Sequence, residues 1–203
     1  STIPAYLNSC KLLNVPPKIH SVHMTATTNK AAQQLGLATG RPVVTIFNLL
    51  GIVVTPDFKT GKQRLKVKNN HPIVENSVIF IDEYTYISRD LYPYLFSRTR
   101  NCKFVFVGDK FQLTAVGEPN CIVDTKGYPT YELTEPMRNK GEPYLVELCS
   151  ALREGVRNTS FGTILEMPGV VDWISDGAVM QALINDKFKQ KNDTDRVLAY
   201  TNK

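Results

Sequence analysis

The sequence lacks a long apolar run. A helix that spans a bilayer needs about 18 or more consecutive apolar residues, and no run within the 203 residues approaches that length. The N-terminal residues also lack the basic-then-apolar order of a signal peptide. These absences predict a cytoplasmic protein without a membrane partner.

Cysteine and histidine are scarce, which excludes the common zinc frameworks. No CxxC pair and no Cys/His cluster of ligand spacing occurs among Cys10, Cys102, Cys121 and Cys149. We expect reduced, mostly buried thiols. His20 and His23 fall in an expected strand, where a packed or surface role is favoured because no metal-type residue lies at matching spacing.

A strong charge imbalance and disorder-promoting composition are also absent. The apolar fraction of 42% and charged fraction of 21% are typical of a globular protein. The net charge of +5 leaves room for a polyanionic partner, but a solvated basic surface explains it equally well. The length suits one large or two small domains.

Two apolar runs end in carboxylates. The run at 78–83 (VIFIDE) is followed by a helical pattern at 91–100 and a second run at 102–109 (CKFVFVGD). Strand, helix and strand in this order indicate a parallel βαβ unit, whose ligands bind outside the carboxyl ends of the strands. Asp82 and Glu83 are better placed to hold a metal ion and orient a water than to act as a general acid and base across a substrate, because neighbouring side chains on a strand point to opposite faces. A strand that ends in a polar turn remains the alternative.

The same reading predicts further elements. A strand leads into a helix with Thr27 or Thr28 as its N-cap, and Gly155 is expected to end a later helix. In chain order the elements are a helix over 3–13, a strand and a helix within 19–37, a strand at 131–135, a helix over 142–155, and a strand, a helix and a strand (RVLAY) between 170 and 203.

A basic β-hairpin is predicted between residues 52 and 69. IVVTPDF and QRLKVKN read as two strands joined by a glycine-containing turn. On the second strand the alternation places four cations on one face, namely Lys62, Arg64, Lys66 and Lys68. These cations are explained equally well by protection of an exposed sheet edge and by contact with phosphates.

Six segments follow the order found in nucleic-acid-dependent nucleoside triphosphatases. They are TATTNKAAQQL, TIFNLLGI, VIFIDEYTYIS, FVFVGDKFQLTAV, YELTEPMRN and RVLAYTNK. In these segments the chain resembles superfamily 1 helicases of the RecD-like 5′-to-3′ branch, most closely the Dda-type helicases of T-even phages. The resemblance implies an α/β fold with a RecA-like parallel sheet flanked by helices, an inserted β-hairpin and the start of a second RecA-like domain.

The resemblance also implies domain bounds. Residues 1–51 and 78–168 would form the first RecA-like domain, 52–77 the hairpin that acts as a strand-separating pin, and 169–203 the beginning of the second domain. A GxxxxGK[ST] phosphate loop is absent from the 203 residues. Because Ser1-Thr2 lead directly into a helix, we expect the chain to begin just inside that loop and to hydrolyse ATP negligibly by itself.

ATP and Mg²⁺ are the implied cofactors. Asp82 would hold Mg²⁺ through a water, and Glu83 would orient or deprotonate the attacking water. Gln112 would sense the γ-phosphate, and Arg138 would supply charge to the transition state. The implied nucleotide contacts are Ser1, Thr2 and Asp109, with the Ser1 hydroxyl also on Mg²⁺.

Single-stranded DNA and fork DNA are the implied partners, and a single-strand-binding protein is a further candidate. Residues at a helix start offer polar groups and a positive dipole end to phosphate, and Phe47 could lie against a base or in the core. The implied contacts are Thr27, Thr28, Asn29, Lys30, Thr45, Phe47, Asn48, Lys62, Arg64, Lys66, Tyr200, Thr201 and Asn202.

The leading hypothesis is an ATP-dependent helicase or translocase on single-stranded DNA, of phage replication or recombination type and then placed in the host cytoplasm. A nucleic-acid-binding module without a functional phosphate loop is the alternative. A small-molecule P-loop kinase is disfavoured because it gives the basic hairpin and the TTNK and YTNK segments no purpose.

Overall fold

The computed structural model describes residues 11–12, 18–56, 63–133, 141–167 and 169–189. The chain divides into two compact units, Ser1–Glu132 and Leu133–Lys203. Within the described residues, no helix is long and apolar enough to cross a membrane. The domain bounds inferred from the resemblance stay a prediction.

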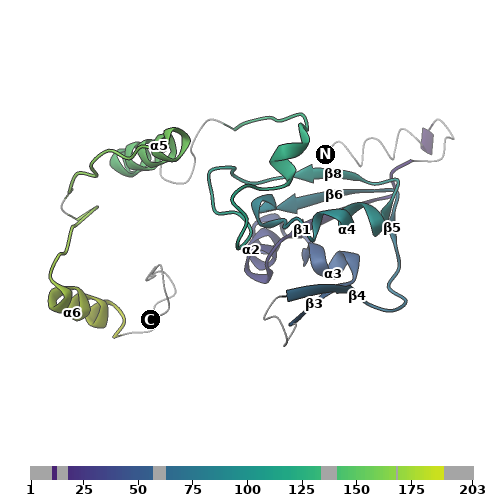
Figure 1. Ribbon diagram of the computed structural model, residues 1–203, viewed down its shortest axis with the longest axis horizontal. Helices are drawn as coiled ribbons and strands as arrows, with labels where there is room; N and C mark the ends of the chain where they lie inside the picture. The colour runs from purple at the N-terminus through teal and green to yellow at the C-terminus, as the bar shows by residue number, and fades with distance from the viewer. Residues whose placement is uncertain (1–10, 13–17, 57–62, 134–140, 168, 190–203) are drawn as a thin grey trace. The chain divides into compact units, whose positions relative to one another are not determined.

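The first unit is built on a parallel four-stranded sheet (Figure 1). Its order is β2-β1-β6-β8, with β1 at Ser21–Ala26, β2 at Val44–Thr45, β6 at Ser77–Asp82 and β8 at Lys103–Phe106. The nearly continuous apolar run of β6 is typical of a strand buried on both faces. The strands predicted at 78–83 and 102–109 are thereby confirmed, and both run in the same direction.

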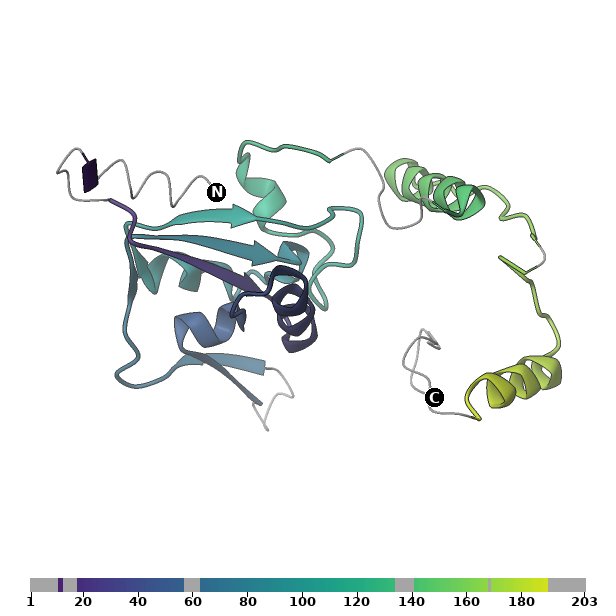
Figure 2. The same cartoon turned by 180° about the vertical axis from the view of Figure 1, so that it is seen from behind.

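Helices flank this sheet, as the RecA-like prediction requires. The helix α2 spans Asn29–Thr39, α3 spans Ile46–Leu50 and α4 spans Tyr92–Ser97. In Figure 1 α4 lies in front of the strands, whereas in the reversed view of Figure 2 α2 lies in front. The apolar core joins Ile79 and Ile81 of β6 to side chains of α3 and α4. It also takes in Cys121 and Val123, the latter in the short 3-10 helix η2 at Val123–Lys126.

The predicted hairpin is confirmed. The strands β3 at Ile52–Pro56 and β4 at Gln63–Val67 pair antiparallel, while the turn residues 57–62 lie outside the described residues. A second small sheet pairs β5 at Val74–Glu75 with β7 at Thr99–Arg100. The helix predicted over 91–100 is therefore wrong at its end, because its last two residues form a strand.

The described residues of the second unit form two helices, α5 at Pro143–Asn158 and α6 at Gly177–Lys187. The end predicted at Gly155 is wrong, since α5 continues to Asn158 and Thr159 takes the left-handed conformation after it. The Phe161 ring packs against Gly155, and a Cβ atom at position 155 would lie only 2.5 Å from Phe161 Cδ1. The strand expected after residue 170 is reduced to one bridge, Met167 with Val171.

Other predicted elements have mixed outcomes. Residues 131–133 have no strand structure, which corrects the strand expected at 131–135 as far as it is described. The helix at 3–13 falls almost wholly outside the described residues, as do Cys10 and the strand RVLAY. The described thiols are free: Cys121 is buried and Cys102 is half-buried, but Cys149 is exposed, contrary to expectation.

Candidate active site

The carboxyl ends of the parallel strands bring the predicted acidic residues to one edge. Ala26 of β1 lies beside Asp82 of β6, and the chain leaving β8 stays beside β6 because Val107 donates its N–H to the Ile81 carbonyl at 2.8 Å. Asp82, Glu83 and Asp109 are all half-buried. The edge that general rules assign to ligands in α/β sheets thus carries three carboxylates, as the sequence predicts.

Glu83 adopts an uncommon backbone conformation at this edge. Its φ of 54° and ψ of 46° place it in the left-handed region, which costs a non-glycine residue of order 1 kcal/mol or more. Three hydrogen bonds support the turn: from Thr27 Oγ1 to the Glu83 carbonyl at 3.2 Å, from the Glu83 N–H to Asp82 Oδ1 at 3.1 Å, and from the Tyr84 N–H to the Val107 carbonyl at 3.1 Å. The strained residue is therefore held by Asp82 of β6 and by the residues that directly follow β1 and β8.

Gly108 is required by the close approach of Tyr84. A Cβ atom at position 108 would lie 2.8 Å from Tyr84 Cδ1 and 3.2 Å from the Tyr84 nitrogen. The Tyr84 hydroxyl donates to Asp124 Oδ1 at 2.8 Å. Burial and this hydrogen bond raise the pKa of Tyr84 well above its ordinary value, so its proton stays in place. Tyr84 thereby links the strand-end glycine to Glu83, its neighbour in the 3-10 helix η1 (Tyr84–Tyr86).

The loop after β8 is organised by Asp109. Its Oδ1 accepts the N–H of Phe111 at 3.1 Å, and its carbonyl accepts the N–H of Gln112 at 2.9 Å. Gln112 itself is exposed. The carboxylate predicted to contact nucleotide is thus also the residue that shapes the turn carrying Gln112.

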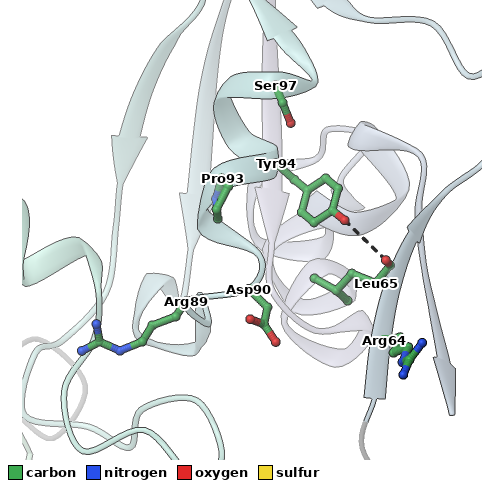
Figure 3. A pocket seen from close by; sticks show the side chains of 7 residues that line it. All are labelled: Arg64, Leu65, Arg89, Asp90, Pro93, Tyr94 and Ser97. Atoms are coloured by element: carbon green, nitrogen blue, oxygen red, sulfur yellow. Dashed lines mark hydrogen bonds between the residues drawn. The ribbon is translucent and has the colours of Figure 1, made fainter. Parts of the chain in front are cut away.

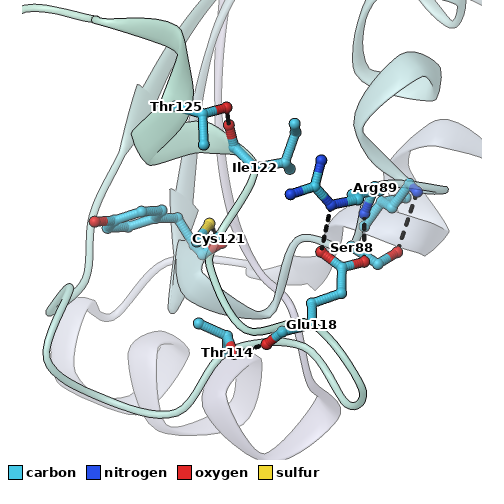
Figure 4. Close-up of polar contacts among 9 residues, drawn as sticks. Ser88, Arg89, Thr114, Glu118, Cys121, Ile122 and Thr125 are labelled. Carbon is cyan, nitrogen blue, oxygen red and sulfur yellow. Dashed lines mark hydrogen bonds and ion pairs between the residues drawn. The ribbon is translucent and has the colours of Figure 1, made fainter.

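The far end of this loop is fastened to the segment that follows Glu83 (Figure 4). Glu118 accepts the backbone N–H of Arg89 on Oε1 at 2.7 Å, and its Oε2 lies 3.9 Å from Arg89 Nε. Thr114 Oγ1 donates to the Glu118 carbonyl at 2.5 Å, and the Ala115 N–H donates to the Thr85 carbonyl at 3.2 Å. No local pattern in the sequence indicates this link, because Arg89 and Glu118 are far apart along the chain.

The threonines predicted to contact nucleic acid already have internal partners. Thr27 is buried and bonded to Glu83 as described, and Thr28 Oγ1 caps α2 by accepting the Ala31 N–H at 3.2 Å. Thr28 is thus the N-cap. The two residues that follow, Asn29 and Lys30, are exposed. The start of α2 therefore presents an amide and an ammonium group to solvent.

The start of α3 is arranged in the same way. Thr45 Oγ1 accepts the Asn48 N–H at 3.1 Å and caps the helix. Asn48 is exposed, whereas Phe47 is half-buried and packs against the apolar core. Of the two roles considered for Phe47, the core role is the one with described contacts.

The hairpin carries its cations on the solvent face of β4. Arg64, Lys66 and Lys68 are exposed, and Leu65 and Val67 between them are half-buried. A groove of about 590 Å³ runs between β4 and α4 (Figure 3). It is lined by Arg64, Leu65, Arg89, Asp90, Pro93, Tyr94 and Ser97. In this lining the Tyr94 hydroxyl donates to the Leu65 carbonyl, and the Arg89 guanidinium lies near Glu118.

Several predicted site residues lie outside the described residues, namely Ser1, Thr2, Lys62, Arg138, Tyr200, Thr201 and Asn202. In the part of the chain that is described, no three His, Cys, Asp or Glu side chains converge as a metal cluster. Mg²⁺ at phosphate sites is bound mainly by water and phosphate with one or two carboxylates. Asp82 fits that role, because among the described residues only the Glu83 N–H bonds to its carboxylate.

The comparison with known families agrees with this architecture. Residues 13–176, most of the chain, match the family described as an AAA domain. That segment includes the four sheet strands and the carboxylates at their ends. The family is one of P-loop nucleoside triphosphatases, which bind nucleotide and usually Mg²⁺. The chain belongs to this AAA domain family, with the parallel α/β fold of a P-loop nucleoside triphosphatase.

Proposed function

We propose that the protein is an ATP-dependent helicase or translocase that moves along single-stranded DNA in the 5′-to-3′ direction. The observation that carries the proposal is Glu83, held in a strained turn beside Asp82 by contacts with the residues that follow the two neighbouring strands. Backbone strain that the surrounding structure maintains is concentrated at functional sites, which supports this role for Glu83. The RecD-like and Dda-type resemblance supports the polarity, and the basic hairpin supports the polyanionic partner.

The side chains at this edge have distinct roles in hydrolysis. Glu83 orients the attacking water and accepts its proton. Asp82 would hold Mg²⁺ through a water, and the metal would supply positive charge beside the phosphates. Gln112 reports the state of the γ-phosphate through the loop fixed by Asp109, and Arg138 stabilises the transition-state charge. Ser1 and Thr2 belong to the nucleotide contacts in this proposal.

Nucleic acid would lie along the start of α2, the start of α3 and the hairpin. Asn29, Lys30 and Asn48 supply exposed polar groups there, while Arg64 and Lys66 neutralise phosphates. Lys62, Tyr200, Thr201 and Asn202 are further proposed contacts. In this arrangement residues 52–77 form the pin that splits a fork, and residues from 169 onward begin the second motor domain.

The proposal is tested with the intact protein and defined DNA substrates. ATP hydrolysis should rise severalfold or more with single-stranded DNA, and a fork with a 5′ tail should be unwound in preference to one with a 3′ tail. Preference for the 3′ tail would contradict the polarity. Binding of DNA without any ATP hydrolysis would contradict the motor and favour the binding module.

A further inference from the structure

Both connections between the hairpin and the sheet meet at one arginine. Arg98, which follows α4, donates from Nε to the carbonyl of Leu50 at 3.3 Å, just before β3. Its Nη2 donates to the carbonyls of His71 at 2.6 Å and Pro72 at 3.4 Å, after β4. One guanidinium therefore binds the chain that enters the hairpin and the chain that leaves it.

The His71 ring closes the same junction. Its Nε2 lies 3.1 Å from the Leu49 carbonyl, and the bond requires the proton on Nε2. The ring also lies so close to Gly51 that a Cβ atom there would be 2.2 Å from His71 Cγ. The Lys68 N–H donates to the Gly51 carbonyl at 2.8 Å. The two connections are thus packed against each other as well as bonded to Arg98.

The helix that leads to Arg98 is itself anchored in the core and contacts the hairpin. Leu91 and Leu95 are fully buried on its inner side. The Tyr94 hydroxyl reaches the Leu65 carbonyl on β4 at 3.4 Å, as Figure 3 shows. The hairpin is consequently held at its base by Arg98 and farther along β4 by Tyr94.

From these contacts we infer that Arg98 is a positioning residue for strand separation, which fixes the angle of the hairpin relative to the sheet. An isolated two-stranded hairpin is marginally stable and would change its orientation when it pushes against a DNA fork. The planar guanidinium offers five donors in a fixed geometry, so it can serve carbonyls on two segments at once, which lysine cannot reproduce. The inference rests on the proposed function of the hairpin as a pin.

The orientation of the hairpin is measured directly by pulsed electron spin resonance. Spin labels are placed on Val54→Cys in β3 and Gln34→Cys in α2, both exposed positions. The intact protein is used with Cys149, which is exposed among the described cysteines, replaced by serine. We expect a narrow distance distribution that Arg98→Ala broadens and Arg98→Lys broadens less. Arg100→Ala is the matched control, because that arginine pairs with Glu75 of β5, outside the paired strands β3 and β4, and should leave the distribution narrow.

The functional measurement uses the same variants on fork DNA. Arg98→Ala should reduce the unwinding rate about tenfold, as misplacement of a working group by about 1 Å can. Hydrolysis of ATP stimulated by single-stranded DNA should stay near that of the unmodified protein, which a merely structural defect would not allow. If Arg98→Ala does not fold, the distance distribution and the unwinding rate are measured in Arg98→Lys and His71→Ala instead.

The possible failures are distinguishable. An unchanged distance distribution in folded Arg98→Ala overturns the inference whatever happens to unwinding. A broadened distribution with normal unwinding overturns the positioning role. Deletion of residues 59–62 then separates the two ideas: loss of unwinding on deletion keeps the pin and rejects only Arg98, whereas normal unwinding rejects the proposed pin itself.

Discussion

Gly108 is the position where a single methyl group should most clearly disturb the candidate site. In Gly108→Ala the new Cβ atom meets Tyr84 at 2.8 Å from Cδ1 and 3.2 Å from the backbone nitrogen. Tyr84 cannot easily move away from the new methyl group, because its N–H donates a hydrogen bond to the Val107 carbonyl and its hydroxyl donates one to Asp124. The φ of +157° at this position adds backbone strain. Overpacking and strain together should lower the free energy of unfolding by about 3 kcal/mol.

Urea unfolding with linear extrapolation measures this loss, and Gly117→Ala is the matched control. Gly117 lies in the same loop with a φ of +81°, and a Cβ atom there would have no neighbour within 4 Å. Its substitution should therefore cost only about 1 kcal/mol of conformational energy. In the intact protein Gly108→Ala should also slow ATP turnover, because a displaced Tyr84 moves Glu83. Equal losses of stability in the two variants would refute the argument from close contact.

Three further changes test other parts of the structure. Glu118→Ala should cost about 1 kcal/mol in urea unfolding by removing the acceptor of the Arg89 N–H, and it should slow turnover. Glu118→Gln keeps an acceptor and most of the stability, and equal effects of the two substitutions would contradict the acceptor role. Replacing Arg64 and Lys66 by alanine should reduce the salt dependence of DNA binding by about 0.7 per lost phosphate contact, with ATP hydrolysis at saturating DNA unchanged, and an unaltered slope would favour edge protection. Burial lowers the pKa of His23 below 6.5, so between the two pKa values the unfolded chain binds a proton and the folded chain does not. The free energy of unfolding should therefore be constant above pH 6.5, decrease as the pH falls from 6.5 to the folded pKa, and be constant again below it. His23→Gln should remove that fall, and its persistence in the variant would assign it elsewhere.

Local patterns predicted the central sheet well because buried parallel strands have a distinctive sequence. The apolar runs that end at Asp82 and before Asp109 need no knowledge of distant residues to be recognised as strands. The alternation on β4 likewise predicted which hairpin residues are exposed. Thr28, one of the two threonines predicted as the N-cap of α2, takes that position through a short-range hydrogen bond.

The errors arise where distant segments decide the outcome. The helix predicted through Arg100 ends at Ser97, because Thr99 and Arg100 pair with β5 instead. Gly155 has the residue type of a helix terminus, but it lies within α5, where the absence of a side chain lets the Phe161 ring pack against it. Local patterns do not indicate the strained turn at Glu83 for the same reason, since the groups that hold it come from Thr27 after β1 and Val107 after β8.

The central claim is that Glu83 activates water for ATP hydrolysis, and Glu83→Gln in the intact protein tests it most directly. The substitution keeps the size of the side chain and removes its capacity to accept a proton. With single-stranded DNA present, nucleotide affinity should stay near that of the unmodified protein while the turnover rate falls at least about a hundredfold, the scale for losing a positioned base. A turnover rate close to that of the unmodified protein would contradict the account.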